Sequence, residues 1–241
     1  MKSEELTKLQ ELQTKIGIQF NDQTTLKKAL IHRSYLNENK DSDLSHNERL
    51  EFLGDAVLEL IITEVLFHTY PKKTEGDLTS YRAATVKTSS LAESANQINL
   101  GDYLYLSKGE EATGGRNRQY ILANTFEALL GAIYLDQGMH TAKDFLTKFL
   151  FPKIEIIVEN RLDIDSKSKL QELAQEQVAL TPIYQLLSET GPDHNKQFEM
   201  GVKIGDHLFG KGVGKSKQEA EQNAAEQALK SWSKVIKQHF S

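Results

Sequence analysis

The chain has no cysteine among its 241 residues, only four prolines and a single tryptophan. The absence of cysteine excludes disulfide bonds, zinc–thiolate sites and thiol catalysis. No stretch reaches about 18 uninterrupted apolar residues, because Glu59 and Glu64 interrupt the longest candidate, so no membrane-spanning helix is expected. The N-terminus is polar and lacks the apolar core of a signal peptide. These absences together predict a cytoplasmic protein without a membrane partner.

The chain also lacks an excess of basic residues. Residues 163–241 carry ten Lys/Arg and eleven Asp/Glu, a net charge of −1, which leaves −4 of the total −5 for the rest of the chain. Neither part is basic, so any affinity for nucleic acid has to come from local patches of charge. Part of the acidic surplus in the first 160 or so residues fits a cation-binding site.

Three carboxylates lie within a short run that otherwise has the pattern of an apolar helix, His46 to Leu58. Glu51 and Asp55 are four residues apart, so on a helix they lie on one face. Two like charges in an apolar setting repel each other and are costly to desolvate, and a divalent cation between them removes both costs. Hard oxygen ligands suit Mg²⁺ or Mn²⁺. A solvated helix face is the alternative. Gly54 in this helix predicts close packing of another backbone.

A second apolar run, residues 124–134, carries side-chain oxygens three residues apart, at Asn124 and Glu127. On a helix these two side chains also share a face. If the two helices pack together, four oxygen-bearing side chains converge on one point. The sequence therefore predicts a divalent-cation site between two helices.

Residues 1 to about 160 have the pattern of successive helices. The periodicity predicts an amphipathic helix with Leu6, Leu9, Leu12 and Ile16, and a second helix that begins at Asp22 or Thr24 and includes Leu26, Ala29 and Leu30. Further helices are predicted over 47–69, 77–97, 119–136 and 140–159. The glycine-rich stretch 109–118 is predicted to be a solvated loop. It lacks the preceding strand of a phosphate-binding loop, and no nucleotide cofactor is expected. RNA contact by Arg116 and Arg118 is the less favoured interpretation of this loop.

After a short polar linker at 160–166 the pattern changes. A helix over 167–177 is followed by strands over 183–189, 198–204 and 207–213, and by a helix from Ser216 to Lys230 or beyond. Gly205-Asp206 predicts a hairpin turn. This α-β-β-β-α order resembles a double-stranded-RNA-binding domain. The predicted fold class is α+β, with an all-α domain over 1–160 and the small α-β-β-β-α domain over 166–233.

Four segments carry a resemblance to bacterial ribonuclease III that covers the whole chain: Leu30–Tyr35, Glu48–Ala56, Glu75–Leu78 and Phe126–Asp136. The resemblance implies a metal-dependent endonuclease for double-stranded RNA that leaves 5′-phosphate and 3′-hydroxyl ends and processes ribosomal and other RNA precursors. It implies Mg²⁺, with Mn²⁺ as a substitute, and a homodimer that cuts both strands.

The resemblance also assigns roles to single residues. The metal ligands would be Glu51, Asp55, Asn124 and Glu127, of which Asp55 and Glu127 are the catalytic pair. Glu48 and Glu75 would line the same cleft, and Phe52 would enter the partner subunit, with a core phenylalanine as the alternative. The RNA contacts of the second domain would be Gln171, Glu172, His194, Lys215, Ser216 and Lys217.

Position 124 departs from the family pattern, which has aspartate there. An amide oxygen still coordinates a hard cation, but the site loses one negative charge. Three interpretations follow: an active natural variant, an RNA-binding protein with a disabled metal site, or an engineered change that traps substrate. The intact Glu51, Asp55 and Glu127 favour the active variant.

Overall fold

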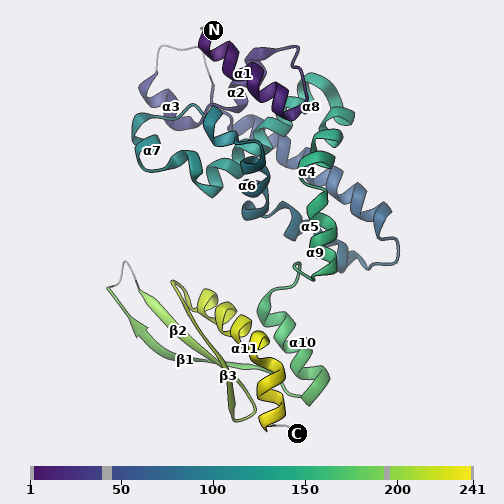
Figure 1. Cartoon of the computed structure of the whole chain (residues 1–241), viewed down its shortest axis with the longest axis vertical. Coiled ribbons are helices and arrows are strands. Elements are labelled where there is room, and N and C mark those ends of the chain that lie inside the picture. The colour runs from purple at the N-terminus through teal and green to yellow at the C-terminus, as the bar shows by residue number, and fades with distance from the viewer. Residues whose placement is uncertain (1–2, 40–44, 193–195, 240–241) are drawn as a thin grey trace. The chain divides into compact units, whose positions relative to one another are not determined.

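The computed structural model describes residues 3–39, 45–192 and 196–239 and divides into two compact units (Figure 1). The first unit spans Met1–Asp163 and the second Ile164–Ser241. Each has a hydrophobic core of its own. In the described part of the chain, no helix combines the length and the apolar composition that crossing a membrane requires.

The first unit is built from helices. In chain order they are α1 (Ser3–Ile16), α2 (Gln23–Ala29), α3 (Arg33–Glu38), α4 (Glu48–Thr69), α5 (Glu75–Val86), α6 (Thr88–Gln97), η1 (Leu100–Tyr103), α7 (Lys108–Ala112), η2 (Gly115–Asn117), α8 (Gln119–Phe149) and α9 (Pro152–Glu159). The predicted cap of α2 is confirmed, because the Asp22 side chain accepts a hydrogen bond from the Thr24 backbone N–H.

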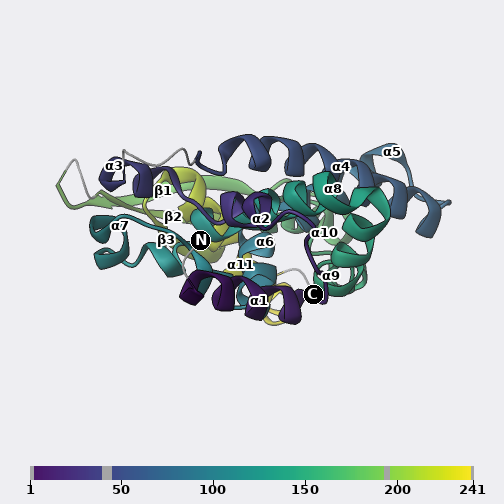
Figure 2. The same ribbon diagram turned by 90° about the horizontal axis from the view of Figure 1, so that it is seen from above.

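Helices α4 and α8 run side by side through this unit (Figure 2). Two glycines permit the contact. A Cβ added at Gly54 would overlap the backbone carbonyl of Glu127, and a Cβ at Gly131 would overlap that of Leu50. The close packing predicted at Gly54 is therefore confirmed, and it places the backbones of the two helices in direct contact.

The structure corrects three predicted elements of the first unit. The predicted helix 77–97 is two helices, because Lys87 has an extended backbone (ψ 149°) between α5 and α6. The helical segment after residue 119 continues as α8 to Phe149, with only Gly138 non-helical, and ends before Pro152 begins α9. The stretch 109–118 is mostly ordered into α7 and η2 and is not a loop, although most of its residues are exposed, as predicted.

The second unit consists of α10 (Ser166–Val178), β1 (Ile183–Thr190), β2 (Gln197–Ile204), β3 (His207–Gly214) and α11 (Lys217–His239). The strands form an antiparallel sheet in the order β1-β2-β3. The predicted α-β-β-β-α order and the turn at Gly205, which has a φ of 59°, are both confirmed. Met200, Val202 and Ile204 of β2 are buried, as the alternation predicts.

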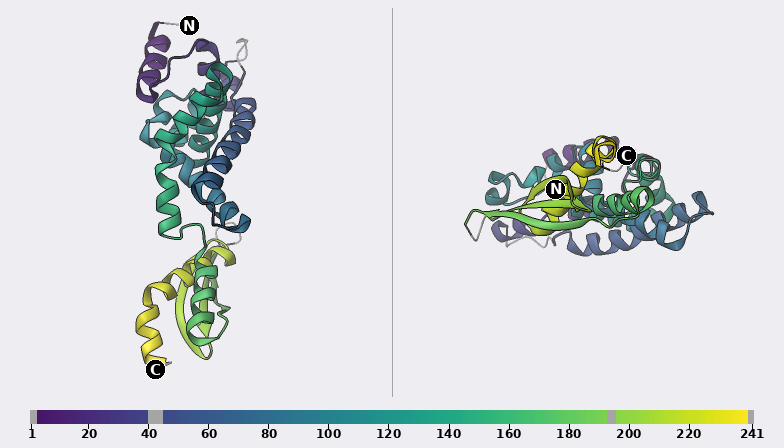
Figure 3. Two further views of the ribbon diagram at one scale, coloured as in Figure 1. Left: turned by 90° about the vertical axis from the view of Figure 1, so that its right-hand side faces the viewer. Right: turned by 90° about the horizontal axis from the view of Figure 1, so that it is seen from below.

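Helix α11 runs along the sheet and packs most closely on β3 (Figure 3). Alternate residues of β3 that face this helix are glycines. A Cβ at Gly210, Gly212 or Gly214 would collide with the backbone of α11 near Ala220, Ala224 or Ala228. Glycine on the strand and alanine on the helix therefore fix how near α11 lies to the sheet.

Candidate active site and nucleic-acid interface

The start of α4 is fixed by Asn47, which is buried. Its backbone N–H donates to the Ile31 carbonyl (2.9 Å) and its side-chain amide donates to the Ala29 carbonyl (3.2 Å). These bonds join α4 to the segment that follows α2. As a result Glu48 and Glu51 occupy the first turn of α4, with Asp55 one turn further on.

The glycine contact between α4 and α8 brings the two predicted pairs of donors together. Asn124 and Glu127 lie on α8 beside the turn of α4 that carries Glu51 and Asp55, and Glu51 and Asn124 line the same cavity. Asp55 is exposed, whereas Glu51, Asn124 and Glu127 are half-buried. The apolar setting expected for these carboxylates is found only in part, because Glu51 and Glu127 are half-buried whereas Asp55 is on a solvated face, which was the alternative.

The electrostatics of the cluster show that its carboxylates interact. Burial, followed by the charges of Asp55 and Glu51, raises the pKa of Glu127 to about 7. Burial and the charge of Glu48 also raise the pKa of Glu51, while a hydrogen bond with the Asn124 side chain opposes that rise. The three carboxylates repel one another, and the amide at 124 relieves part of that repulsion.

The donor set has the chemistry that a hard divalent cation requires: carboxylates and an amide oxygen on two packed helices. Within the described ranges, however, no three His, Asp or Glu side chains are grouped closely enough to form a complete cation site. Like charges that are not neutralised stay apart, so a cation would have to draw these side chains together. The residues fit the ion in chemistry and location, and the repulsion among them favours its binding.

Glu48 lies beside this cluster, and two basic groups flank it. The Arg33 guanidinium and the His46 ring each lie 3.7 Å from its carboxylate.

Glu75 does not lie beside this cluster. It is the first residue of α5, its carboxylate accepts a hydrogen bond from Thr79 (3.0 Å), and it lines a separate pocket with Phe67 and other residues. One copy of the chain therefore does not bring Glu75 into the cleft of Glu48.

Phe52 is not a core residue. Its side chain is 81% exposed, although it lies between two predicted metal ligands in the sequence. Leu60 and Phe67 of the same helix are also exposed. These side chains form an apolar stripe along α4, which we call the α4 stripe (Phe52, Leu60 and Phe67).

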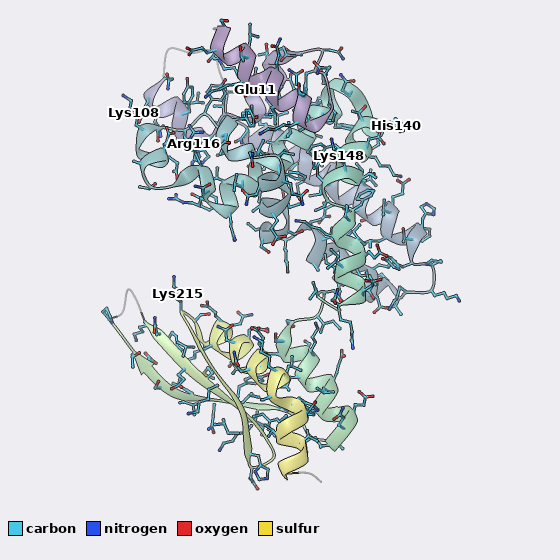
Figure 4. All side chains as sticks on the ribbon, in the orientation of Figure 1. Glu11, Lys108, Arg116, His140, Lys148 and Lys215 are labelled. Atoms are coloured by element: carbon cyan, nitrogen blue, oxygen red, sulfur yellow. The ribbon has the colours of Figure 1, made fainter. Side chains whose placement is uncertain are left out.

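In the second unit the predicted RNA contacts lie on exposed helix positions. Gln171 and Glu172 are exposed on α10, and Lys215, Ser216 and Lys217 are exposed at the start of α11. Lys215 extends away from the ribbon (Figure 4). The predicted contact His194 lies outside the described residues.

Ser216 has a structural role in addition to the predicted one. Its hydroxyl oxygen accepts a hydrogen bond from the Glu219 backbone N–H (3.1 Å), and the Glu219 carboxylate accepts one from the Lys215 backbone N–H (2.7 Å). The two bonds cap α11 and fix the backbone from which Lys215 and Lys217 extend.

The arginines of the 109–118 stretch hold that segment together. Arg116 donates to the Gly101 (2.9 Å) and Leu104 (3.0 Å) carbonyls and pairs with Glu111 (2.7 Å), and Arg118 pairs with Glu110 and donates to the Thr113 carbonyl (3.0 Å). These partners could not be predicted from the sequence, because they are contributed by other turns of the same region.

Sequence reasoning also missed a group of residues beside the cluster. His32, Arg33 and Tyr120 line the cavity that Glu51 and Asn124 border. They come from two segments, His32-Arg33 at the start of α3 and Tyr120 on α8, so no spacing in the sequence relates Tyr120 to the other two. Only the resemblance at Leu30–Tyr35 drew attention to this region, and it assigned no site role to it.

Comparison with known proteins agrees with this description. Residues 22–154 match the family model described as Ribonuclease-III-like, and residues 166–231 match the double-stranded RNA binding motif. The chain is 49% identical over 222 residues to Ribonuclease 3 of Pelotomaculum thermopropionicum, covering 92% of each chain. It is 50% identical over 222 residues to Ribonuclease 3 of Geobacillus kaustophilus, covering 92% of this chain and 90% of the relative.

The first unit also resembles a solved structure, the nuclease domain of ribonuclease III from Campylobacter jejuni. The TM-score is 0.55 and the sequence identity 41%, over 60% of this chain and 99% of the other. That structure was described for flexibility in a region involved in dimer formation. With a matching family model over more than half of its length and relatives at about half identity over nearly all of it, this chain belongs to the ribonuclease III family of endoribonucleases.

Proposed function

We propose that this enzyme hydrolyses phosphodiester bonds of double-stranded RNA with divalent cations held by Glu51, Asp55, Asn124 and Glu127. The products would carry 5′-phosphate and 3′-hydroxyl ends, as in the processing of ribosomal and other RNA precursors. The observation that carries the proposal is the glycine contact between α4 and α8, which sets these four oxygen donors beside one another.

The chain's own residues would act mainly by holding and orienting. Glu51, Asp55 and Glu127 have to be ionised together to bind a cation, and this is opposed by the burial and the neighbouring charges that raise the pKa of Glu127 to about 7. The close packing of α4 on α8 would hold the four oxygen donors in position while RNA binds. When bound, Mg²⁺, or Mn²⁺ in its place, activates a water and stabilises the leaving oxygen in an in-line displacement.

Cutting both strands of a duplex requires two such sites, and we assign them to a symmetric homodimer. The exposed α4 stripe supports this assignment, because a monomeric protein rarely exposes several large apolar side chains along one helix. A pocket of about 420 Å³ lies at the far end of the stripe and is lined by Leu66, Phe67 and Leu78. Across a twofold axis near the middle of α4, the Phe52 ring of one copy would enter this pocket of the other.

The same arrangement gives Glu75 a place. It lines the pocket that would receive Phe52, so dimer formation would bring it toward the Glu48 and Glu51 region of the other copy. The predicted role of Glu75 in the cleft is thus proposed for the dimer and not for a single chain.

The second unit would bind the duplex on either side of one major groove. Gln171 and Glu172 on α10 would reach 2′-hydroxyls in a minor groove, and Lys215, Ser216 and Lys217 would meet phosphates at the start of α11. Their exposure supports this assignment. The positive end of the α11 dipole adds to the charge of the two lysines.

One feature favours a second candidate function, a protein that binds RNA without cutting it. Asn124 supplies no negative charge to the cation site. We favour the nuclease, because the three carboxylates of the cluster are present and interact.

The deciding experiment incubates long double-stranded RNA and Mg²⁺ with the unmodified protein and with the variants Glu127→Gln, Asn124→Asp and Glu11→Gln. Glu11 is an exposed carboxylate on α1 and serves as the matched control (Figure 4). The proposal expects cleavage by the unmodified protein and by Glu11→Gln, and its loss in Glu127→Gln. RNA binding without cleavage, with cutting only in Asn124→Asp, would instead establish the second function.

A further inference from the structure

A cavity of about 320 Å³ extends from the proposed cation site away from Asp55. We call it the lateral pocket. Glu51 and Asn124 form the side that it shares with the cation site, and its remaining wall includes His32, Arg33, Glu48 and Tyr120. Its size is at the lower end of the range for small-ligand sites. No role proposed so far uses His32, Arg33 or Tyr120.

His32 presents a hydrogen-bond donor that the fold does not use. Its Nδ1 accepts from the Ser34 backbone N–H (3.3 Å) and lies 2.8 Å from the Ser34 hydroxyl, which itself accepts from the Ser107 backbone N–H (3.1 Å). The Ser34 hydroxyl therefore donates to Nδ1, and the imidazole proton is on Nε2. Burial lowers the pKa of His32, which keeps the ring neutral at pH 7. Within the described residues Nε2–H has no recorded partner.

Arg33 is held only weakly. Its side chain is 74% exposed, and its closest recorded ionic contact is Glu48 at 3.7 Å. A charge-assisted hydrogen bond between these groups would be nearer about 2.8 Å. The guanidinium can therefore leave Glu48 for a better acceptor without a large loss of interaction energy.

Three carboxylates line the lateral pocket, and Glu48 is flanked by the Arg33 guanidinium and the His46 ring, each at 3.7 Å. Glu110 is paired with Arg118, and Glu51 would be neutralised by a bound cation. The Arg118 guanidinium lies over the Tyr120 ring, 5.9 Å from its centroid, and donates to its hydroxyl (3.3 Å). Tyr120 is thus held as a half-exposed aromatic wall. Among the described residues, His32 Nε2–H and the Arg33 guanidinium are donors of this pocket that can turn to a ligand, and both suit a phosphate or ribose oxygen.

We propose that the lateral pocket is a subsite for the RNA backbone beside the scissile bond, where His32 and Arg33 donate to oxygens of one flanking phosphate and Tyr120 packs on the adjoining ribose. This inference rests on the proposed function, because it takes the cation site as the point of cleavage. It adds three substrate-binding residues, His32, Arg33 and Tyr120, that carry no metal.

The test uses the full-length protein and a short RNA duplex with one defined cleavage site. Arg33→Ala is compared with Arg33→Lys and with Lys72→Ala, which removes an exposed positive charge elsewhere in the first unit. His32→Asn keeps a side chain that caps α3 but removes the Nε2 donor. Each duplex is made in versions that carry a neutral methylphosphonate at one phosphate on either side of the scissile bond.

We expect Arg33→Ala to lower kcat/KM by about 10- to 100-fold, as for a lost hydrogen bond to a charged group, with partial recovery in Arg33→Lys and less than about twofold change in Lys72→Ala. His32→Asn should lower it by a smaller factor. One methylphosphonate should impair the unmodified enzyme and have no further effect on Arg33→Ala, because the two changes remove the same contact.

The subsite is refuted if Arg33→Ala behaves as Lys72→Ala does, or if every methylphosphonate effect multiplies with that of Arg33→Ala. Absence of cleavage by the unmodified protein is a different result, since it refutes the proposed function. In that case the affinity of the Glu127→Gln protein for each duplex is compared with and without Arg33→Ala. A loss of affinity that Arg33→Ala and one methylphosphonate share would still support the pocket. Thermal melting of each variant identifies any that fails to fold.

Discussion

Burial and the charges of Asp55 and Glu51 change the protonation of Glu127. Its pKa is about 7 in the folded protein, against 4.5 for an unperturbed glutamate, so the folded state binds a proton there more tightly than the unfolded state. Below pH 4.5 a carboxyl group with a raised pKa is protonated in both the folded and the unfolded state, so it does not lower the free energy of unfolding. The destabilisation grows as the pH rises from 4.5 to 7 and is complete above 7.

Glu127→Gln should therefore stabilise the cation-free protein at pH 8 by on the order of 2 kcal/mol, a value discounted for solvent screening, and by much less at pH 5. Thermal melts in EDTA at both pH values measure this, with Glu11→Gln as the control. Added Mg²⁺ should raise the melting temperature of the unmodified protein and not that of Glu127→Gln. Equal effects at the two pH values would contradict the raised pKa.

Asn124 sets the charge of the same cluster. Asn124→Asp adds a fourth carboxylate beside Glu51 and Glu127, so it should tighten Mg²⁺ binding by on the order of 10-fold and lower stability in EDTA. Isothermal calorimetry of the cation measures the first effect and thermal melting the second. Asn96→Asp, on an exposed turn of α6, is the control and should change neither. Unchanged cation affinity in Asn124→Asp would remove residue 124 from the site.

At the scale of elements, the contact of α4 with α8 determines whether a site exists. Gly54→Ala should cost about 3 kcal/mol or more, because the new Cβ would overlap the Glu127 carbonyl and force the helices apart. Gly109→Ala, in α7 with open space around it, should be neutral or slightly stabilising. Urea unfolding of both variants makes the comparison. A cost below about 1 kcal/mol for Gly54→Ala would mean that the contact is looser than described.

Most of these elements could be predicted from the sequence. The apolar periodicity predicts α4 and the first part of α8, Asp22 predicts the start of α2, and the alternation in β2 predicts its buried face. The break at Lys87 could not be predicted, because nothing in its side chain disfavours a helix and the bend comes from packing of α5 and α6 against other helices.

The candidate site was predicted only in part. Spacing on a helix pairs Glu51 with Asp55 and Asn124 with Glu127, but exposure depends on what covers the helix, so the exposure of Asp55 could not be predicted from spacing. The lateral pocket could not be predicted, because Tyr120 is far in the sequence from His32 and Arg33 and only the fold brings the two segments to one cavity.

At the scale of the whole molecule, the α4 stripe predicts a dimer. Phe52→Asp places a charge where an aromatic ring should be buried, so it should shift the protein from dimer to monomer at micromolar concentration. Light scattering after size-exclusion chromatography measures the mass. Ile156→Asp changes a similarly exposed apolar residue on α9 and should leave the dimer intact. A dimer that persists in Phe52→Asp would place the interface elsewhere.

The second unit should contribute affinity that depends on salt. Lys215→Ala and Lys217→Ala should each weaken binding of double-stranded RNA and lower the slope of log affinity against log salt by about 1. Lys211→Ala, on the face of the sheet away from α11, should leave the slope unchanged. Fluorescence anisotropy at about 50 to 200 mM salt gives these slopes, because counterion release changes the affinity strongly over that range. Equal slopes for Lys211 and Lys215 variants would argue against a specific phosphate contact.

Crystals grown with Mn²⁺ would show whether a divalent cation binds between α4 and α8. We expect an anomalous difference map with density bounded by Glu51, Asp55 and Glu127 in the unmodified protein, and no density there in Glu127→Gln. Mn²⁺ found only at other carboxylates would contradict a cation site at this cluster.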